Sequence, residues 1–180
     1  MGSTKLLLWI GAVMGSLQLG QGVPATPDSL IKSGPYRNAK FQYLVQLPPG
    51  FQHELAPPSQ EDRGFRARLP VEGTVWMAAT HSDSTTIAGI VSVVRKSHRA
   101  CRETANRPTK LAGLEASDME FTCPGPKGDR ANRFVIAVRK DPSGGLTEYV
   151  IGLESPVSMD GRAITAFEII RRGFRVTGKS

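Results

Sequence analysis

Apolar residues alternate with polar or small residues in several short segments along the chain. This period of two places every second side chain on one face and is typical of half-buried β-strands. The alternating segments are FQYLVQL (41–47), GFRARL (64–69), TVWMAAT (74–80), residues 111–123, RFVIAVRK (133–140) and LTEYVIGL (146–153). The turn-forming sequences PGPKGDR and DPSGG separate the last three segments, which are therefore predicted to form an antiparallel meander.

Other segments between residues 52 and 105 do not alternate in this way. TIAGIVSVV (86–94) is almost entirely apolar and rich in β-branched residues, which predicts a central strand buried on both faces. The following SHRACRETA (97–105) fits either a short helix or an irregular crossover. Residues 52–63, with Pro57 and Pro58 in the middle, are predicted to form a loop.

After Pro156 the apolar residues follow a helical period of about 3.6 residues. The positions that share one face are Ile164, Phe167, Ile170 and Phe174. This spacing predicts a C-terminal amphipathic helix that ends at Gly173. Ser158 or Asp160 is expected to cap its first turn.

The N-terminus, MGSTKLLLWIGAVMGSLQLGQG, has the pattern of a secretory signal peptide. One cation at Lys5 precedes an apolar run, and small residues follow at Gly20 and Gly22. The run is shorter than the roughly 20 apolar residues that a membrane-spanning helix needs, so an uncleaved anchor is only the alternative. Cleavage is predicted after Gly22, or a few residues later after Ala25.

The sequence therefore predicts four parts: a signal peptide (1–22), a linker or N-terminal arm (23–40), a single domain (41–176) and a tail (177–180). The domain is predicted to be α+β, with a mainly antiparallel β-sheet packed against the C-terminal helix and room for one or two further short helices. The mature chain contains no further apolar run long enough to span a membrane. It is expected to be secreted or periplasmic.

Charge suggests a class of partner. Removing residues 1–22 leaves 22 basic and 16 acidic side chains, a net charge of +6. The candidate patch for an anionic partner lies in RKSHRACR and consists of Arg95, Lys96, Arg99 and Arg102. Its partner would be phospholipid headgroups, an envelope polymer or the acidic face of an envelope protein. Ordinary solubilising charge is the alternative. Nucleic acid is not an expected partner, because export removes the chain from the cytosol and no DNA- or RNA-binding motif is present.

The two cysteines of the chain, Cys101 and Cys123, are separated by 21 residues. In an oxidising compartment two thiols in one small domain tend to pair, so a structural disulfide is predicted. Closing a loop of this length would add about 3 kcal/mol to the free energy of unfolding. A redox role is not favoured, because redox-active pairs use a close Cys-x-x-Cys spacing.

A zinc site would need more ligands than the two cysteines. His98 precedes Cys101 at an H-x-x-C spacing, and His81 with Cys123 would complete a set of four. However, the chain offers no second closely spaced ligand pair, and a disulfide would consume both thiolates. We therefore predict neither a metal nor another cofactor.

No familiar catalytic motif is present: the chain lacks Gly-x-Ser-x-Gly, His-Glu-x-x-His, Walker and Rossmann patterns. THSDSTT places His81, Asp83 and several hydroxyls together, and a polar turn is the simpler interpretation. Asp118 and Glu120 would share one face of a strand, where such pairs are usually solvated. No catalytic residue is therefore assigned.

The order of elements carries one further indication. A first strand that runs into LPPGF, a mainly antiparallel sheet, and a closing EYVIGLESPVSMDGRAITAFEIIRRGFR together resemble the Mog1/PsbP-like family over residues 41–176. The resemblance implies an α+β sandwich of a sheet flanked by helices. It also implies a binding or assembly role rather than an enzymatic one, and it brings no site that can be transferred residue by residue.

Three functional hypotheses follow from these observations. The first is an exported, non-catalytic binding or assembly module at the cell envelope. The second is a secreted hydrolase whose site is built from scattered residues such as His81, Asp83 and a serine. The third is a binder of a small apolar ligand, with a deep pocket lined by residues such as Trp76 or Phe167.

Overall fold

The computed structural model describes the chain from Leu30 to Gly178 with several gaps. The described residues are 30–31, 33–55, 64–69, 73–82, 86–142, 144–158 and 161–178. The expected signal peptide (1–22), its cleavage sites and the Pro57–Pro58 part of the expected loop lie outside these residues.

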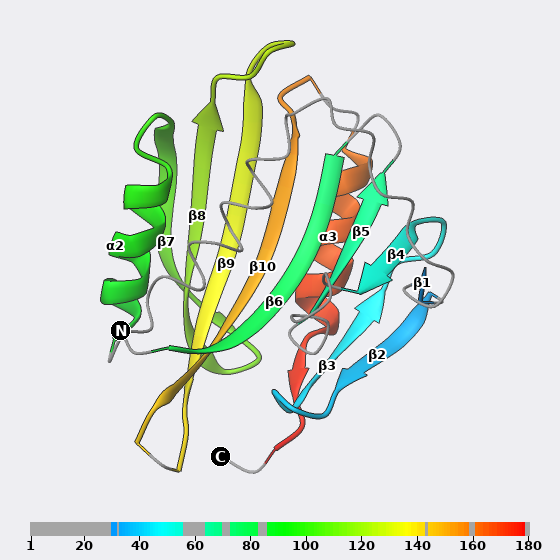
Figure 1. Cartoon of the computed structure of the whole chain (residues 1–180), viewed down its shortest axis with the longest axis vertical. Helices are drawn as coiled ribbons and strands as arrows, with labels where there is room; N and C mark the ends of the chain where they lie inside the picture. The colour runs from blue at the N-terminus through cyan, green and yellow to red at the C-terminus, as the bar shows by residue number, and fades with distance from the viewer. Residues whose placement is uncertain are drawn as a thin grey trace.

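Most strands of the described chain form one antiparallel sheet of eight (Figure 1). Its spatial order is β1-β4-β5-β6-β10-β9-β8-β7. The bounds are β1 Leu30–Ile31, β4 Gln52–Leu55, β5 Gly64–Leu69, β6 Gly73–Ser82, β7 Arg102–Leu111, β8 Leu114–Cys123, β9 Arg130–Lys140 and β10 Leu146–Pro156. The sequential pairing of β8, β9 and β10 confirms the predicted meander.

A second, smaller sheet has the order β11-β3-β2, with β2 Gly34–Asn38, β3 Tyr43–Leu47 and β11 Arg175–Val176. Both of its pairings are antiparallel. Strand β2 lies in the segment expected as a linker or N-terminal arm (23–40) and pairs with β3 along its whole length. This part of the arm is therefore a strand of the fold.

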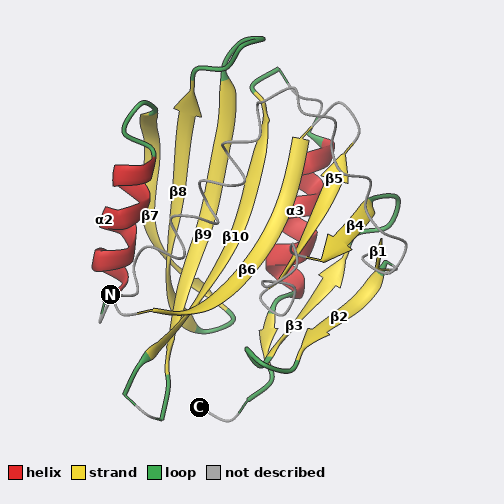
Figure 2. Ribbon diagram, in the orientation of Figure 1, coloured by secondary structure: helices red, strands yellow, loops and turns green. Residues whose placement is uncertain are grey.

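Two helices cover opposite faces of the large sheet, α2 (Ile87–Ser97) and α3 (Arg162–Gly173), as Figure 2 shows. The alternation of β9 shows how both faces are buried. Phe134 and Ile136 pack with α2 in one apolar cluster, whereas Val135 and Ala137 pack with α3 in the other. The α3 cluster also contains the apolar residues of β3, so the small sheet and α3 together cover that face. The predicted α+β class, with its mainly antiparallel sheet and C-terminal helix, is confirmed.

The prediction of a central strand at TIAGIVSVV is wrong, because this segment forms helix α2. Its buried residues, Ile90, Val91 and Val94, have the i, i+1, i+4 spacing of one helical face. Thr86 caps the helix, since its hydroxyl oxygen accepts a 3.2 Å hydrogen bond from the backbone N–H of Gly89. The low intrinsic helix propensity of valine and isoleucine costs less than the burial of this face contributes.

Two further predictions are corrected by the sheet. Residues 52–55 were expected in a loop but form β4, which pairs with β5. SHRACRETA is neither a helix nor an irregular crossover, because it holds the end of α2, a tight turn and the start of β7. Strand β7 has few buried side chains and therefore lacks the alternation that identified the other strands.

Helix α3 confirms the predicted C-terminal helix but differs in its buried face. Ile164 is 47% exposed, whereas Ala163 and Ala166 are buried beside Phe167 and Ile170. Small residues thus let the helix approach the sheet closely.

The predicted cap of α3 is also wrong. The N-cap is Gly161 and not Ser158 or Asp160, and it makes no side-chain capping hydrogen bond. Gly161 has φ 90°, a left-handed conformation that favours glycine. Within the described residues, no helix is both long enough and apolar enough to cross a bilayer.

Candidate functional site

A disulfide joins Cys101 and Cys123, as predicted. It connects the turn after α2 to the last residue of β8, with the two Cα atoms 4.3 Å apart. The backbone N–H of Cys101 also donates a 2.8 Å hydrogen bond to the carbonyl oxygen of His98, which tightens this turn. The bond therefore fastens the end of α2 and the start of β7 to the sheet.

His98 packs beside this disulfide as a structural residue. Its ring stacks on Phe121 at 4.6 Å between centroids and meets Phe134 edge-on at 4.9 Å. The contact of 2.9 Å between His98 Nδ1 and the carbonyl oxygen of Val94 requires a proton on Nδ1, which then closes the last turn of α2. Burial lowers the pKa of His98, so the ring is neutral at physiological pH.

The disulfide removes both sulfurs from the zinc set of His81, His98 and the two cysteines. Among the described residues, no group of three or more His, Cys, Asp or Glu side chains could hold a metal ion. The site next to the disulfide is therefore a packed aromatic cluster.

The four residues of the predicted basic patch have different surroundings. Arg95 is engaged by Glu103 of β7 through two hydrogen bonds of 2.7 and 2.8 Å. Lys96, Arg99 and Arg102 are exposed, and no described acid pairs with them. Arg95 and Lys96 also lie in the last turn of α2, where cations interact favourably with the helix dipole. Three cations thus remain for a partner.

Among the described residues, the acid paired with His81 is Asp141, which the sequence did not suggest. Asp83 lies outside the described residues, and His81 Nδ1 is 3.4 Å from Asp141 Oδ2. The hydroxyl of Thr147 donates to both oxygens of Asp141 at 2.9 Å and is fully buried. This hydroxyl orients the acid and is not placed as a nucleophile for His81.

Trp76 and Phe167, the proposed pocket residues, lie on opposite faces of the large sheet. Both are buried, and the Trp76 ring occupies the space that a side chain at Gly152 would take. The two residues therefore contribute to two packed cores and do not line a common cavity.

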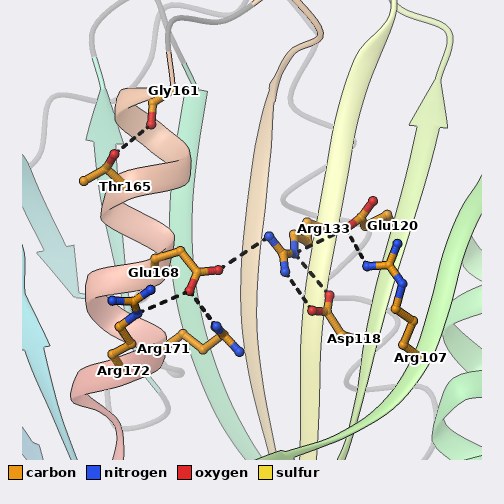
Figure 3. Close-up of polar contacts among 9 residues, drawn as sticks. All are labelled: Arg107, Asp118, Glu120, Arg133, Gly161, Thr165, Glu168, Arg171 and Arg172. Atoms are coloured by element: carbon orange, nitrogen blue, oxygen red, sulfur yellow. Dashed lines mark hydrogen bonds and ion pairs between the residues drawn. The ribbon is translucent and has the colours of Figure 1, made fainter.

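Arg133 organises a polar network on the α3 face (Figure 3). Its guanidinium donates to both oxygens of Asp118 at 3.1 and 2.7 Å, and it lies 3.5 Å from Glu168 of α3. Its carbon Cζ lies 5.1 Å from the ring centroid of Phe167. The hydrogen bonds to Asp118 raise the pKa of Arg133. This network fastens α3 to the sheet, and the expectation of a solvated pair at Asp118 and Glu120 is wrong for the buried Asp118.

Glu148 on β10 is a buried carboxyl group on the α2 face. It is 2% exposed, and its Oε1 has no hydrogen-bond partner. Thr80 of β6 and Val138 of β9 are its cross-strand neighbours, and neither can neutralise a carboxylate. Burial raises its pKa to about 7.

Comparison with known proteins gives a fold and no sequence relative. No family model matches the chain, and no curated protein matches it in sequence. Among solved structures it is similar to LpqN of Mycobacterium tuberculosis, described as involved in cell envelope biogenesis, with a TM-score of 0.61 and 10% identity over 82% of this chain and 91% of LpqN. It is also similar to the cyanobacterial PsbP protein CyanoP of Synechocystis sp. PCC 6803, with a TM-score of 0.57 and 13% identity over 88% of this chain and 98% of CyanoP. A third similar structure is the Ran-binding protein Mog1p of Saccharomyces cerevisiae, with a TM-score of 0.53 and 11% identity over 82% and 96% of the two chains.

The chain has the Mog1/PsbP-like fold. This confirms the fold that the sequence resemblance implied, and at such identities it establishes the fold alone.

Within this Mog1/PsbP-like fold, three residues of interest were missed by sequence reasoning: Arg133, Asp141 and Glu148. The register of β6 and β10 places Thr147 opposite His81 and so brings Asp141, the acceptor of the Thr147 hydroxyl, near His81; the sequence alone does not show this register. An acidic residue inside the alternating run LTEYVIGL was the available signal for Glu148. Arg133 of β9 contacts Asp118 of β8 and Glu168 of α3, and no local sequence pattern predicts such contacts.

Proposed function

We propose that this chain is an exported, non-catalytic binding or assembly module of the cell envelope. The observation that carries the proposal is the Cys101–Cys123 disulfide, because structural disulfides form and persist in oxidising compartments. The signal-peptide pattern of residues 1–22 supports the same location. So does the similarity in fold to LpqN, which is described as involved in cell envelope biogenesis.

The arrangement of polar residues favours binding over catalysis. The Thr147 hydroxyl beside the His81–Asp141 pair donates to Asp141 and is not placed as a nucleophile for His81. Arg133 and its acids are engaged with one another and connect α3 to the sheet. Among the described residues, Lys96, Arg99 and Arg102 are exposed cations without an acidic partner, and an anionic envelope component is the partner that they fit.

Affinity capture from the native envelope tests this proposal. The bait is the oxidised protein, and the comparison is the Arg99→Glu/Arg102→Glu variant. A charge-matched control changes Lys110→Glu and Lys140→Glu, two exposed cations at the other end of their strands. We expect a specific envelope component that the wild type and the control retain and the first variant loses.

The hydrolase hypothesis is tested in parallel by measuring the turnover of a generic ester and a generic peptide. Absence of any specific envelope component, together with turnover that His81→Ala abolishes, would refute the proposal. A protein found in the cytosol with both cysteines reduced would refute the location.

A further inference from the structure

Three chain connections that the structure describes in whole or in part lie at one end of the large sheet (Figure 1). They are the α2–β7 turn (98–101), the β8–β9 connection (124–129), and residues 157–158 after β10 together with the first turn of α3. We call this surface the loop end. The β7–β8 and β9–β10 hairpins lie at the opposite end of the same strands.

The loop end is held together by two links between its parts. The Cys101–Cys123 bond joins the first connection to the strand that leads into the second. The backbone N–H of Val157 donates a 3.1 Å hydrogen bond to the carbonyl oxygen of Asp129, which joins the second connection to the third. These two links connect segments that are far apart in the sequence.

The described cations in or next to the loop end include two kinds. Arg95 and Arg130 are engaged by Glu103 and Glu154, each at 2.7 Å. Arg99, Arg102 and Lys127 are exposed and have no acidic partner among the described residues. The exposed acids Glu103 and Asp129 lie in the same part of the chain. This surface therefore carries positive charges that no ion pair among the described residues neutralises.

The same end exposes aliphatic side chains. Among the described residues, the exposed large hydrophobic residues are Val157 at 59% and Ile164 at 47%. Both belong to the third connection, with Ile164 in the first turn of α3. Neither contributes to the two apolar clusters of the fold.

We propose that the loop end docks on an anionic phospholipid surface, with Arg99, Arg102 and Lys127 at the headgroups and Val157 and Ile164 at the boundary with the acyl chains. This inference rests on the proposed function and names the partner as lipid. Cations beside exposed aliphatic residues are the combination that interfacial membrane binding uses. An acidic protein face or a soluble polyanion would account for the cations but not for the exposed valine and isoleucine.

Vesicle sedimentation tests the inference on the purified protein with its disulfide intact. Vesicles of phosphatidylglycerol and phosphatidylcholine are compared with vesicles of phosphatidylcholine alone. We expect binding to the anionic vesicles only, and loss of that binding in about 1 M salt, where charges are screened within about 3 Å.

Charge variants locate the surface. Arg102→Glu/Lys127→Glu should lower the partition coefficient at least about thirtyfold, since each cation near an anionic surface contributes roughly fivefold. Lys110→Glu/Lys140→Glu makes the same change in net charge at the opposite end and should lower it less than about threefold. Equal losses in the two variants would overturn the inference, because binding would then depend on net charge alone.

Substitutions of the two exposed aliphatic residues test whether they contribute to vesicle binding. Val157→Ser/Ile164→Ser should weaken binding by roughly five- to tenfold, while Val157→Ile/Ile164→Val should leave it unchanged. Equal midpoints of urea unfolding show that the variants fold. Absence of vesicle binding, or binding that the serine variant retains in full, would overturn the inference. Envelope capture of a protein partner in that case would leave the proposed function standing.

Discussion

The two faces of the large sheet hold their helices by different means. On the α3 face, Arg133 links strand acids to Glu168, so polar groups pair with one another across the helix–sheet contact. On the α2 face, the end of the helix is fixed by a covalent bond beside an aromatic cluster.

The faces also differ in how well their polar groups are satisfied. Four buried side-chain atoms of the described chain have no hydrogen-bond partner. Three of them, in His98, Asn132 and Glu148, lie on the α2 face, and the fourth belongs to His53. An unpaired buried polar group costs stability and a disulfide adds it, so the α2 face combines both contributions.

The largest change in stability is expected when the Cys101–Cys123 disulfide is removed. Cys101→Ser/Cys123→Ser should lower the free energy of unfolding by about 3 kcal/mol, as the chain-entropy account of such a loop implies. Urea unfolding of the oxidised protein and the variant measures the difference. Reductant should shift the wild type to the variant's midpoint and leave the variant unchanged. A variant as stable as the wild type would show that packing alone holds α2.

On the α3 face, Arg133→Leu should lower the free energy of unfolding by about 2–3 kcal/mol, because it leaves the buried Asp118 carboxylate without its partner. Arg107→Ala is the matched control, since this exposed arginine lies 3.7 Å from Glu120 and such pairs contribute less than about 1 kcal/mol. Thermal or urea unfolding of both variants measures the contrast. Equal costs would mean that the network is not what fastens α3.

Glu148 should make the α2 face sensitive to pH. Its raised pKa means that the folded state binds this proton more tightly than the unfolded state does. The stability contributed by Glu148 is therefore full below its unfolded pKa of 4.5, falls as the pH rises to about 7, and stays constant above.

Glu148→Gln should consequently stabilise the fold by up to about 3 kcal/mol near pH 8 and by almost nothing near pH 4. Burial lowers the pKa values of His53 and His98, so their protonation opposes folding at low pH. Subtracting the unfolding free energy of the wild type from that of the variant at each pH removes this common contribution. A difference that does not change with pH would contradict the raised pKa.

The smallest changes in stability are expected from substitutions at the N-termini of the two helices. Thr86→Ala removes the side-chain cap of α2 and should cost about 1 kcal/mol. Ser158→Ala should change stability by less than about 0.3 kcal/mol, because α3 begins at Gly161 without a side-chain cap. Urea midpoints of the two variants give the comparison, and a larger loss for Ser158→Ala would contradict the assigned start of α3.

The elements that the sequence predicted well are those with a regular apolar period, although β9 is buried on both faces and not half-buried as its alternation had indicated. Strand β9 and helix α3 carry their periodicity in their own residues, and Cys101 could pair with no cysteine other than Cys123. The prediction for residues 86–94 was wrong because it gave more weight to their β-branched residues than to the helical spacing of Ile90, Val91 and Val94.

The candidate site was less predictable than the fold. The basic patch could be located, but Glu103 as the partner of Arg95 depends on how β7 folds back along α2. The pairing of His81 with Asp141 depends in the same way on the register of β6 and β10. Lys127 and Val157 join the loop end only through contacts between connections. Such long-range neighbours have no signature in the local sequence.

The central claim is that this chain folds and works outside the cytoplasm as a binding module fastened by Cys101–Cys123. Alkylation of thiols in intact cells of the native host, quenched in acid and read by mass measurement, tests it most directly. The account predicts a chain that lacks residues 1–22 and takes up no alkyl group until reductant is added, and then takes up two. A full-length chain that takes up two alkyl groups without reductant would contradict it.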